Sequence, residues 1–130
     1  MFDLKSYDYI IDAIDTMESK LLLIEQAAAS HTPVISCLAT EGRIDPSRFE
    51  IADISRTGNI CPAAKKMRSE LRKKGIRKVK VLYSRERCPR GNRIEKGTLT
   101  GSISFVTGVA GMLIAGQAVR DLLMEKKKKN

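Results

Sequence analysis

Two aspartates, Asp12 and Asp15, lie at the far end of a short apolar run near the start of the sequence. The run 9–14 is rich in β-branched residues and is typical of a strand that is buried on both faces. From Met17 onward the apolar residues follow helical spacing, so Asp15 falls where a strand joins a helix. A carboxylate at such a join can hold a magnesium ion, or order a phosphate through that ion. Asp15 is therefore our candidate for ligand chemistry.

A plainer interpretation of Asp15 is that it caps the helix that follows. Glu18 comes three residues later, and this spacing matches an N-cap with a capping-box glutamate. Capping aspartates are common at the start of helices. In an open α/β sheet, however, the carboxyl ends of parallel strands gather at the edge where ligands bind. The local pattern leaves both interpretations open.

The residues around this join predict a βαβ unit that presents Asp15 at the edge of a parallel sheet. We expect a strand over 9–14, a helix over about 16–30 and a second buried strand over 34–39, joined by a right-handed crossover. His31 is the only histidine and falls in the connection at the opposite end of the sheet. We therefore interpret it as a solvated loop residue.

The middle of the chain adds strands and a helix. Alternation of Phe49 and Ile51 predicts an antiparallel strand over 49–54, and the run 79–84 predicts another strand. Pro62 and Gly75 bracket a helix, because proline suits a first turn and glycine suits a left-handed stop. The fold class that we expect is α/β: a partial Rossmann-like sheet with a parallel βαβ start, antiparallel C-terminal strands and flanking helices.

The chain carries a net charge of +9, from 24 Lys and Arg against 15 Asp and Glu. A surplus of this size favours a polyanionic partner such as RNA, or an anionic membrane surface. Much of it lies on the helix over 61–75 and in a basic, turn-rich loop over 85–98. The helix either has a solvated surface or follows a phosphate backbone. The RNA-contact candidates are Lys65, Lys66, Arg68, Arg72, Lys73, Arg85 and Arg87.

The three cysteines, Cys37, Cys61 and Cys88, are odd in number and form no CxxC pair. This pattern predicts a reduced, intracellular protein with no zinc and no disulfide framework. The N-terminus lacks a basic region followed by an apolar core, which favours a cytoplasmic protein without a signal peptide. We interpret Cys37 as a small core residue and Cys88 as an exposed loop thiol, which neighbouring arginines could make reactive.

The segment 101–119 contains no charged residue. Alternation over 101–106 predicts a strand, and the small residues over 107–119 predict a buried helix that packs closely on a sheet. A transmembrane anchor is the rival interpretation, because the segment is long enough and is followed by four lysines at 126–129. Its serines, Thr107 and Gln117 weaken that interpretation, so we expect no stable membrane span.

The motif around Asp15 resembles the E1-like ThiF/MoeB/HesA superfamily, whose apolar strand ends in Asp-Ala/Cys-x-Asp with a basic residue five positions on. Here the motif is Asp12-Ala13-Ile14-Asp15 with Lys20. Three more segments are similar to the CsdL/TcdA branch, the tRNA threonylcarbamoyladenosine dehydratases. They are Arg43-Ile44-Asp45-Pro46, then Ala52-Asp53-Ile54-Ser55-Arg56-Thr57, then Pro62-Ala63-Ala64 with Arg68, Leu71 and Gly75. Together with the C-terminal segment, the resemblance covers most of the chain.

The resemblance implies an enzyme that uses ATP and magnesium to activate a carboxylate on tRNA and then closes a ring with net loss of water. It implies that Asp15 positions the metal and the phosphates, and that Lys20 contacts the nucleotide. The implied partners are tRNA and a sulfur-relay or carrier protein. Cys61 matches a position that the family fills variably, so no catalytic role follows for it.

One part of the implied machinery is missing from the sequence. The superfamily carries a glycine-rich phosphate loop in its N-terminal half, whereas this chain has no GxGxxG. The resemblance therefore implies that residues 1–130 are a single domain, the C-terminal portion of the fold. We expect negligible ATP turnover by this chain alone, because that loop supplies the N–H groups that cradle phosphates. We also expect a homodimer, because a half-sheet leaves apolar surface exposed.

Two other functions stay open. One is an activating enzyme for a ubiquitin-like or sulfur-carrier protein, although many such relatives carry zinc cysteines that this chain lacks. The other is a non-enzymatic module that dimerises or binds RNA through its basic helix.

Overall fold

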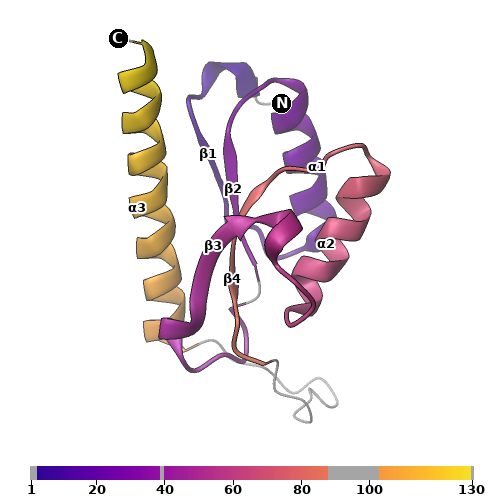
Figure 1. Cartoon of the computed structure of the whole chain (residues 1–130), viewed down its shortest axis with the longest axis vertical. Helices are drawn as coiled ribbons and strands as arrows, with labels where there is room; N and C mark the ends of the chain where they lie inside the picture. Colours follow the sequence, from indigo (N-terminus) through magenta and orange to yellow (C-terminus); the bar gives the residue numbers. More distant parts are fainter. Residues whose placement is uncertain (1–2, 39, 88–102, 130) are drawn as a thin grey trace.

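The protein is described from a computed structural model, which covers residues 3–38, 40–87 and 103–129. A mixed four-stranded sheet forms its centre, with helices on both faces (Figure 1). Helices α1 and α2 lie against each other on one face, and α3 covers the other face. The α/β class expected from the sequence is confirmed.

The sheet has the strand order β1-β2-β4-β3. Strands β1 (Ile10–Asp12), β2 (Val34–Cys37) and β4 (Lys80–Ser84) run parallel. Strand β3 (Phe49–Asp53) pairs antiparallel with β4, as its alternating pattern predicted. Strand β1 lies at one edge of the sheet, so its outer side has no neighbouring strand among the described residues.

The βαβ unit is confirmed, but its helix begins later than expected. Helix α1 (Met17–Ala29) has Thr16 as its N-cap, and no side chain caps it. The predicted role of Asp15 as the cap is therefore wrong, and Asp15 lies one residue before it. Helix α1 packs Leu21, Ile24 and Ala27 inward. Because the cap needs no carboxylate from Asp15, this side chain is free to point elsewhere.

Helix α2 (Pro62–Lys73) matches its predicted signals. Pro62 occupies the first turn, and Gly75 follows the helix with a φ of 77°, a left-handed conformation that glycine adopts without a Cβ clash. Its buried face is a thin stripe of Ala64, Met67 and Leu71. These side chains pack with residues of α1 and β4 in the hydrophobic core on this side of the sheet. The rest of α2 faces solvent.

Helix α3 (Ser104–Lys129) differs from its prediction in two ways. The strand expected over 101–106 is wrong where it is described, because the helix already starts at Ser104; residues 101 and 102 lie outside the described residues. The helix is also much more exposed than expected. It packs only Val106, Ala110, Ile114 and Ala118 against the sheet. Close packing of its glycines is likewise wrong, because a Cβ at Gly108 would meet no atom within 4 Å.

A polar cluster anchors the far end of α3 to the sheet. Asp121 accepts hydrogen bonds from the Tyr9 hydroxyl at 2.6 Å and from Lys80 Nζ at 2.7 Å. Gln117 donates to the other carboxylate oxygen. Burial, followed by the hydrogen bond to Asp121, raises the pKa of Tyr9. The cluster ties α3 to β1 and β4, which lie on either side of β2.

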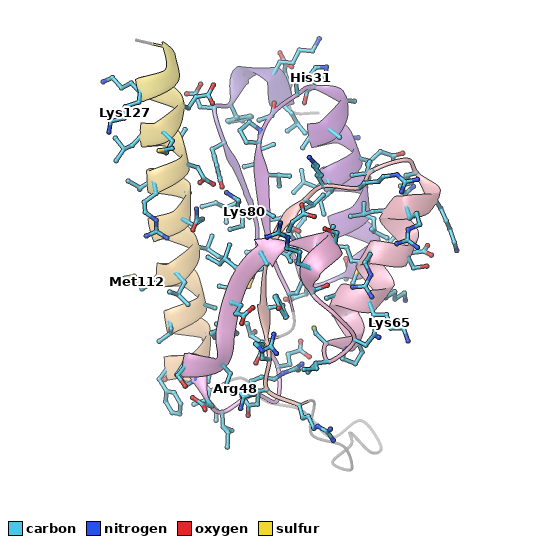
Figure 2. All side chains as sticks on the ribbon, viewed as in Figure 1. His31, Arg48, Lys65, Lys80, Met112 and Lys127 are labelled. Atoms are coloured by element: carbon cyan, nitrogen blue, oxygen red, sulfur yellow. The ribbon has the colours of Figure 1, made fainter. Side chains whose placement is uncertain are left out.

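Three short 3-10 helices complete the fold: η1 (Leu4–Ser6), η2 (Pro46–Arg48) and η3 (Ile54–Arg56). Asp45 and Asp53 cap the last two through their side chains. The hydrogen bonds from Ser47 lower the pKa of Asp45. Figure 2 shows His31 at the end of the molecule away from the carboxyl ends of the parallel strands, where it is exposed as predicted.

Candidate functional site

A hollow of about 370 Å³ lies at the carboxyl ends of β1 and β2, beside the first turns of α3. We call it the edge pocket. Its polar lining includes Asp15, Lys20, Thr40 and Glu41. Its apolar and small lining residues are Ile11, Ala13, Ile14, Cys37, Leu38, Thr107, Ala110, Gly111 and Ile114. Asp15 is exposed and lines this pocket. The structure therefore places it at the carboxyl-end edge of the sheet, as the sequence predicted.

The turn that carries Asp15 is held by a buried carboxylate, that of Asp12 at the end of β1. Asp12 is fully buried, and its Oδ1 accepts a hydrogen bond from the backbone N–H of Ile14 at 3.0 Å. Its Oδ2 accepts from Ser36 Oγ at 2.6 Å and from Lys20 Nζ at 3.3 Å. Lys20 Nζ also donates to the Cys37 carbonyl at 2.6 Å. Buried charges are stable only when they are paired and hydrogen-bonded. Moving the turn would break these contacts, so they hold it in place.

Lys20 therefore has a structural role that the sequence did not predict. Its side chain is only 6% exposed, and two of its three donors are engaged by Asp12 and Cys37. Lys20 still lines the edge pocket, so one donor remains for a ligand there. The contact between Lys20 and a nucleotide stays a prediction, and the ion pair is the role that the geometry supports directly.

Glu41 brings a second carboxylate to the edge pocket. The loop that carries it is held from the side by Glu86, whose carboxylate accepts from the backbone N–H groups of Ile44 and Asp45 at 3.0–3.1 Å. Magnesium is commonly bound by one or two protein carboxylates together with substrate phosphates. Asp15 and Glu41 fit that pattern. Within the described residues, no group of three or more metal-binding side chains occurs.

Two cysteines can be placed, and neither is set up as a nucleophile. Burial is the main cause that raises the pKa of Cys37, and the ammonium of Lys20 only partly offsets it. A raised pKa leaves little reactive thiolate at neutral pH. Cys61 is fully buried in the core. The prediction that Cys37 is a core residue is approximately confirmed, because it is half-buried. No position was predicted for Cys61, and Cys88 lies outside the described residues.

The RNA-contact candidates separate into available and engaged side chains. Lys65, Lys66, Arg72 and Lys73 are exposed on α2, although Lys73 pairs with Glu70 on the same helix. Figure 2 shows Lys65 on the side of the molecule away from α3.

Arg68 is less available than its neighbours on α2. Its guanidinium donates to Thr57 Oγ1, the Gly58 carbonyl and Asn59 Oδ1 at 2.9–3.2 Å, which holds the loop before the helix.

The candidates from the basic loop are described only at its start. Arg85 Nε lies 3.6 Å from Glu50 Oε2, and the Arg85 side chain is still 46% exposed. Arg87 is exposed as well. The loop prediction from residue 88 onward lies outside the described residues. Arg43, which the sequence singled out only as part of a motif, is buried, and its Nε and Nη2 have no hydrogen-bond partner among the described residues.

Sequence reasoning named Asp12 only as part of a motif and missed its partners. A signal was present, because an aspartate inside a buried apolar strand is rarely stable unless it is paired. Lys20, in the first turns of the predicted helix that follows, was the cation available to pair with Asp12. Glu41 was also missed, and the sequence held no comparable signal for it, because it lies in a loop whose path depends on Glu86.

Comparison with known proteins identifies what the chain is similar to. The model of the ThiF family matches residues 3–130. The tRNA threonylcarbamoyladenosine dehydratase of Bacillus subtilis is 39% identical over 132 residues, which cover 91% of this chain and 52% of that protein. Dehydratase 1 of Saccharomyces cerevisiae is 38% identical over 85 residues, or 65% of this chain and 20% of that protein. The chain thus spans about half the length of its Bacillus relative and less of the other.

Solved structures support the same fold. The Escherichia coli enzyme TcdA in complex with ATP matches 96% of this chain and 51% of its own, with a TM-score of 0.82 and 24% identity. A second structure of the same enzyme matches 95% of this chain and 50% of its own, with a TM-score of 0.78 and 25% identity. Both structural alignments extend over nearly the whole of this chain.

Proposed function

Because the chain belongs to the ThiF family, we propose that it is part of an ATP-dependent tRNA threonylcarbamoyladenosine dehydratase. The observation that carries this proposal is the position of Asp15 in the edge pocket, at the carboxyl ends of parallel strands. Open α/β sheets bind nucleotides at such edges. The segment that would complete the ATP site corresponds to the half of the relatives that this chain does not cover. That residues 1–130 are the C-terminal portion of such a protein stays a prediction.

In the proposed reaction, ATP activates the carboxylate of threonylcarbamoyladenosine on tRNA. The activated acyl group is then attacked from within the same modification. The ring closes as the activated carboxylate oxygen leaves on the phosphorus that ATP supplied, which accounts for the net loss of water. No protein nucleophile is needed, which agrees with the raised pKa of Cys37. Magnesium would neutralise charge on the phosphates. Asp15 and Glu41 would hold that ion, and the Asp12–Lys20 pair would keep the turn before α1 in place.

A chimera tests this proposal directly. The matched segment of the Bacillus subtilis relative would be replaced by this chain, and the purified chimera given ATP and tRNA that carries threonylcarbamoyladenosine. We expect dehydration of the tRNA. We also expect the dehydration rate to fall by about 100-fold or more in Asp15→Asn, because the variant removes a carboxylate that helps to stabilise charge in the transition state. Asp8→Asn is the matched control, because Asp8 is also exposed but precedes β1. A folded chimera that is inactive, or one indifferent to Asp15→Asn, would contradict the proposal.

We further propose that the exposed lysines of α2 contact the tRNA backbone. Each phosphate contact adds to the salt dependence of binding. Removing two charges with Lys65→Ala and Lys66→Ala should therefore lower the slope of log affinity against log salt by about 2. Lys126→Ala with Lys127→Ala removes the same charge from α3 and is the control. Equal slopes for the two double variants would exclude a dedicated RNA face on α2.

The other candidate functions are weaker on these observations. An activating enzyme for a ubiquitin-like or sulfur-carrier protein would act at the same pocket, and release of pyrophosphate that depends on such a carrier would identify it. A non-enzymatic RNA-binding module is favoured only by the charge of α2. The cytoplasmic location, the homodimer and a relay partner remain predictions.

A further inference from the structure

One wall of the edge pocket is a single face of α3. The residues that form it follow helical spacing: Thr107, Ala110, Gly111 and Ile114. Most of them have a short side chain or none. Strand β1 and the turn after it add Ile11 and Ile14, which are 49% and 37% exposed. The edge pocket therefore has an apolar half beside the half that carries Asp15, Lys20 and Glu41.

Packing within the chain does not explain why residue 111 is a glycine. A Cβ at Gly111 would meet no atom within 4 Å, and glycine is among the least favourable residues inside a helix. Gly108 has equally open surroundings, but it is not among the residues that line the edge pocket. An open glycine alone is therefore no signal. At position 111, however, a side chain would project from the pocket wall and reduce the space of about 370 Å³.

We propose that the apolar half of the edge pocket binds the aliphatic side chain of the amino acid carried by the modified base, and that Gly111 determines how large this side chain can be. The inference rests on the proposed dehydratase function. In that reaction the carboxylate of the threonylcarbamoyl group must meet the phosphates, close to the ion that Asp15 and Glu41 would hold. The threonine side chain starts at the carbon next to this carboxylate, so it must lie close to the same two residues. Ile14, which precedes Asp15, offers it an apolar surface.

The adenosine of ATP is the other group that could occupy the apolar half, and the topology of the sheet argues against it. The outer side of β1 has no neighbouring strand among the described residues. Because exposed sheet edges are normally covered, we place the half of the relatives that this chain does not match beyond β1. ATP would approach from that side, whereas α3 lies over a face of the sheet (Figure 1). A volume of about 370 Å³ is also near the lower end for ligand pockets, about 300–1,000 Å³, which favours the smaller occupant.

A change of pocket size matched to a change of substrate size tests the proposal in the chimera described above. Gly111→Val adds an apolar group in a nearly fixed orientation, because valine has one strongly preferred rotamer in a helix. Its substrates are tRNA with threonylcarbamoyladenosine and tRNA with the glycine analogue, which lacks the side chain. We expect the variant to lose about 10–200-fold in kcat/KM for the threonine substrate. It should process the glycine analogue as well as the unsubstituted chimera does, with an unchanged KM for ATP.

Gly108→Val is the matched control, because it makes the same change on the same helix outside the edge pocket. It should leave the activity towards both substrates unchanged. The proposal would be overturned if Gly111→Val lost both substrates equally, or if it behaved like Gly108→Val. A raised KM for ATP with an unchanged preference between the two tRNA substrates would assign the apolar half to adenosine and would overturn it as well.

A binding measurement separates this proposal from the proposed function. The nucleoside N6-threonylcarbamoyladenosine is titrated into the 130-residue chain while the methyl signals of Ile11 and Ile114 are followed by NMR. We expect these signals to shift in the unsubstituted chain and in Gly108→Val, but not in Gly111→Val. Shifts together with an inactive unsubstituted chimera would refute the dehydratase function and leave the binding site standing. No shift at millimolar nucleoside would overturn the binding site even if the chimera were active.

Discussion

Replacing Lys20 with methionine would measure how strongly the buried ion pair holds the turn before α1. The Lys20 ammonium lies 3.3 Å from Asp12 Oδ2, and the two side chains are 6% and 0% exposed. Methionine keeps a long apolar stem but removes the charge. Asp12 would keep its hydrogen bonds from Ser36 and Ile14, while the Cys37 carbonyl would lose the donor that it now has at 2.6 Å.

The expected cost follows from what Asp12 retains. Removing one partner of a buried ion pair costs about 3–5 kcal/mol. Because Asp12 keeps two hydrogen-bond donors, we expect Lys20→Met to lower the free energy of unfolding by about 3 kcal/mol, near the lower end of this range. Lys73→Met is the control, because Lys73 is 70% exposed in its pair with Glu70 and should cost less than about 0.5 kcal/mol. Urea unfolding followed by circular dichroism measures both.

A double variant separates the unpaired charge from the lost packing. Asp12→Asn combined with Lys20→Met leaves no buried charge, so it should be more stable than Lys20→Met alone. If Lys20→Met cost no more than Lys73→Met, the pair would not stabilise the turn. If the double variant were as unstable as the sum of the single changes, the cost would not come from an uncompensated carboxylate.

Four further changes test other contacts, three by the same unfolding measurement and the last by hydrogen exchange. Tyr9→Phe should cost about 1–2 kcal/mol near neutral pH, through the lost hydrogen bond to Asp121. Because the folded state raises the Tyr9 pKa, that stability is fully present below about pH 10 and should be lost as the pH rises further, so the two proteins should converge in alkali. Gly75→Ala should cost about 1 kcal/mol because φ is 77°, whereas Gly108→Ala should stabilise the monomer by about 0.5–1 kcal/mol in open helical space. Arg68→Ala should speed hydrogen exchange in residues 57–59, and unchanged exchange there would show that its three hydrogen bonds do not hold that loop.

The first two thirds of the fold could be predicted because local signals and tertiary packing agree there. The β-branched run before Asp12, the turn residues Pro62 and Gly75, and the alternation around Ile51 each point to one element only. Their expected positions differ from the structure by a few residues at the ends. The cap at Asp15 was wrong because Thr16, the next residue, is also a favourable N-cap, so the sequence pattern does not separate the two positions.

The last helix could not be placed from local pattern alone. The sequence Ser-Ile-Ser-Phe-Val before Thr107 alternates like a strand, yet Ser104 already belongs to α3. Its many small and apolar residues suggested burial on all sides. Only a narrow face of the helix meets the sheet: Ala110 and Ile114 pack in a cluster with Ile35 and Leu82. The partly buried residues of that cluster are Tyr9, Cys37, Phe49 and Ile51. How much of a helix is buried depends on its neighbours, which the helix sequence does not contain.

The position of Asp15 was predictable, but the support beneath it was not. Topology alone brings the end of β1 to the edge of the sheet. The Asp12–Lys20 contact joins residues eight apart across a strand and a helix, and Ser36 comes from another strand. Such contacts depend on the register between β1 and β2 and on the rotation of α1, which no local pattern specifies.

Strand β4 lies between β2 and β3 although it follows both of them in the chain. During synthesis, β2 and β3 must therefore leave the ribosome before the strand that joins them exists. The facing backbone edges of β2 and β3 stay unpaired until residues 80–84 have emerged. Contacts that close late over long sequence separations form slowly and expose the nascent chain to aggregation. Synthesis thus includes an interval in which these two edges can pair with strands of other chains.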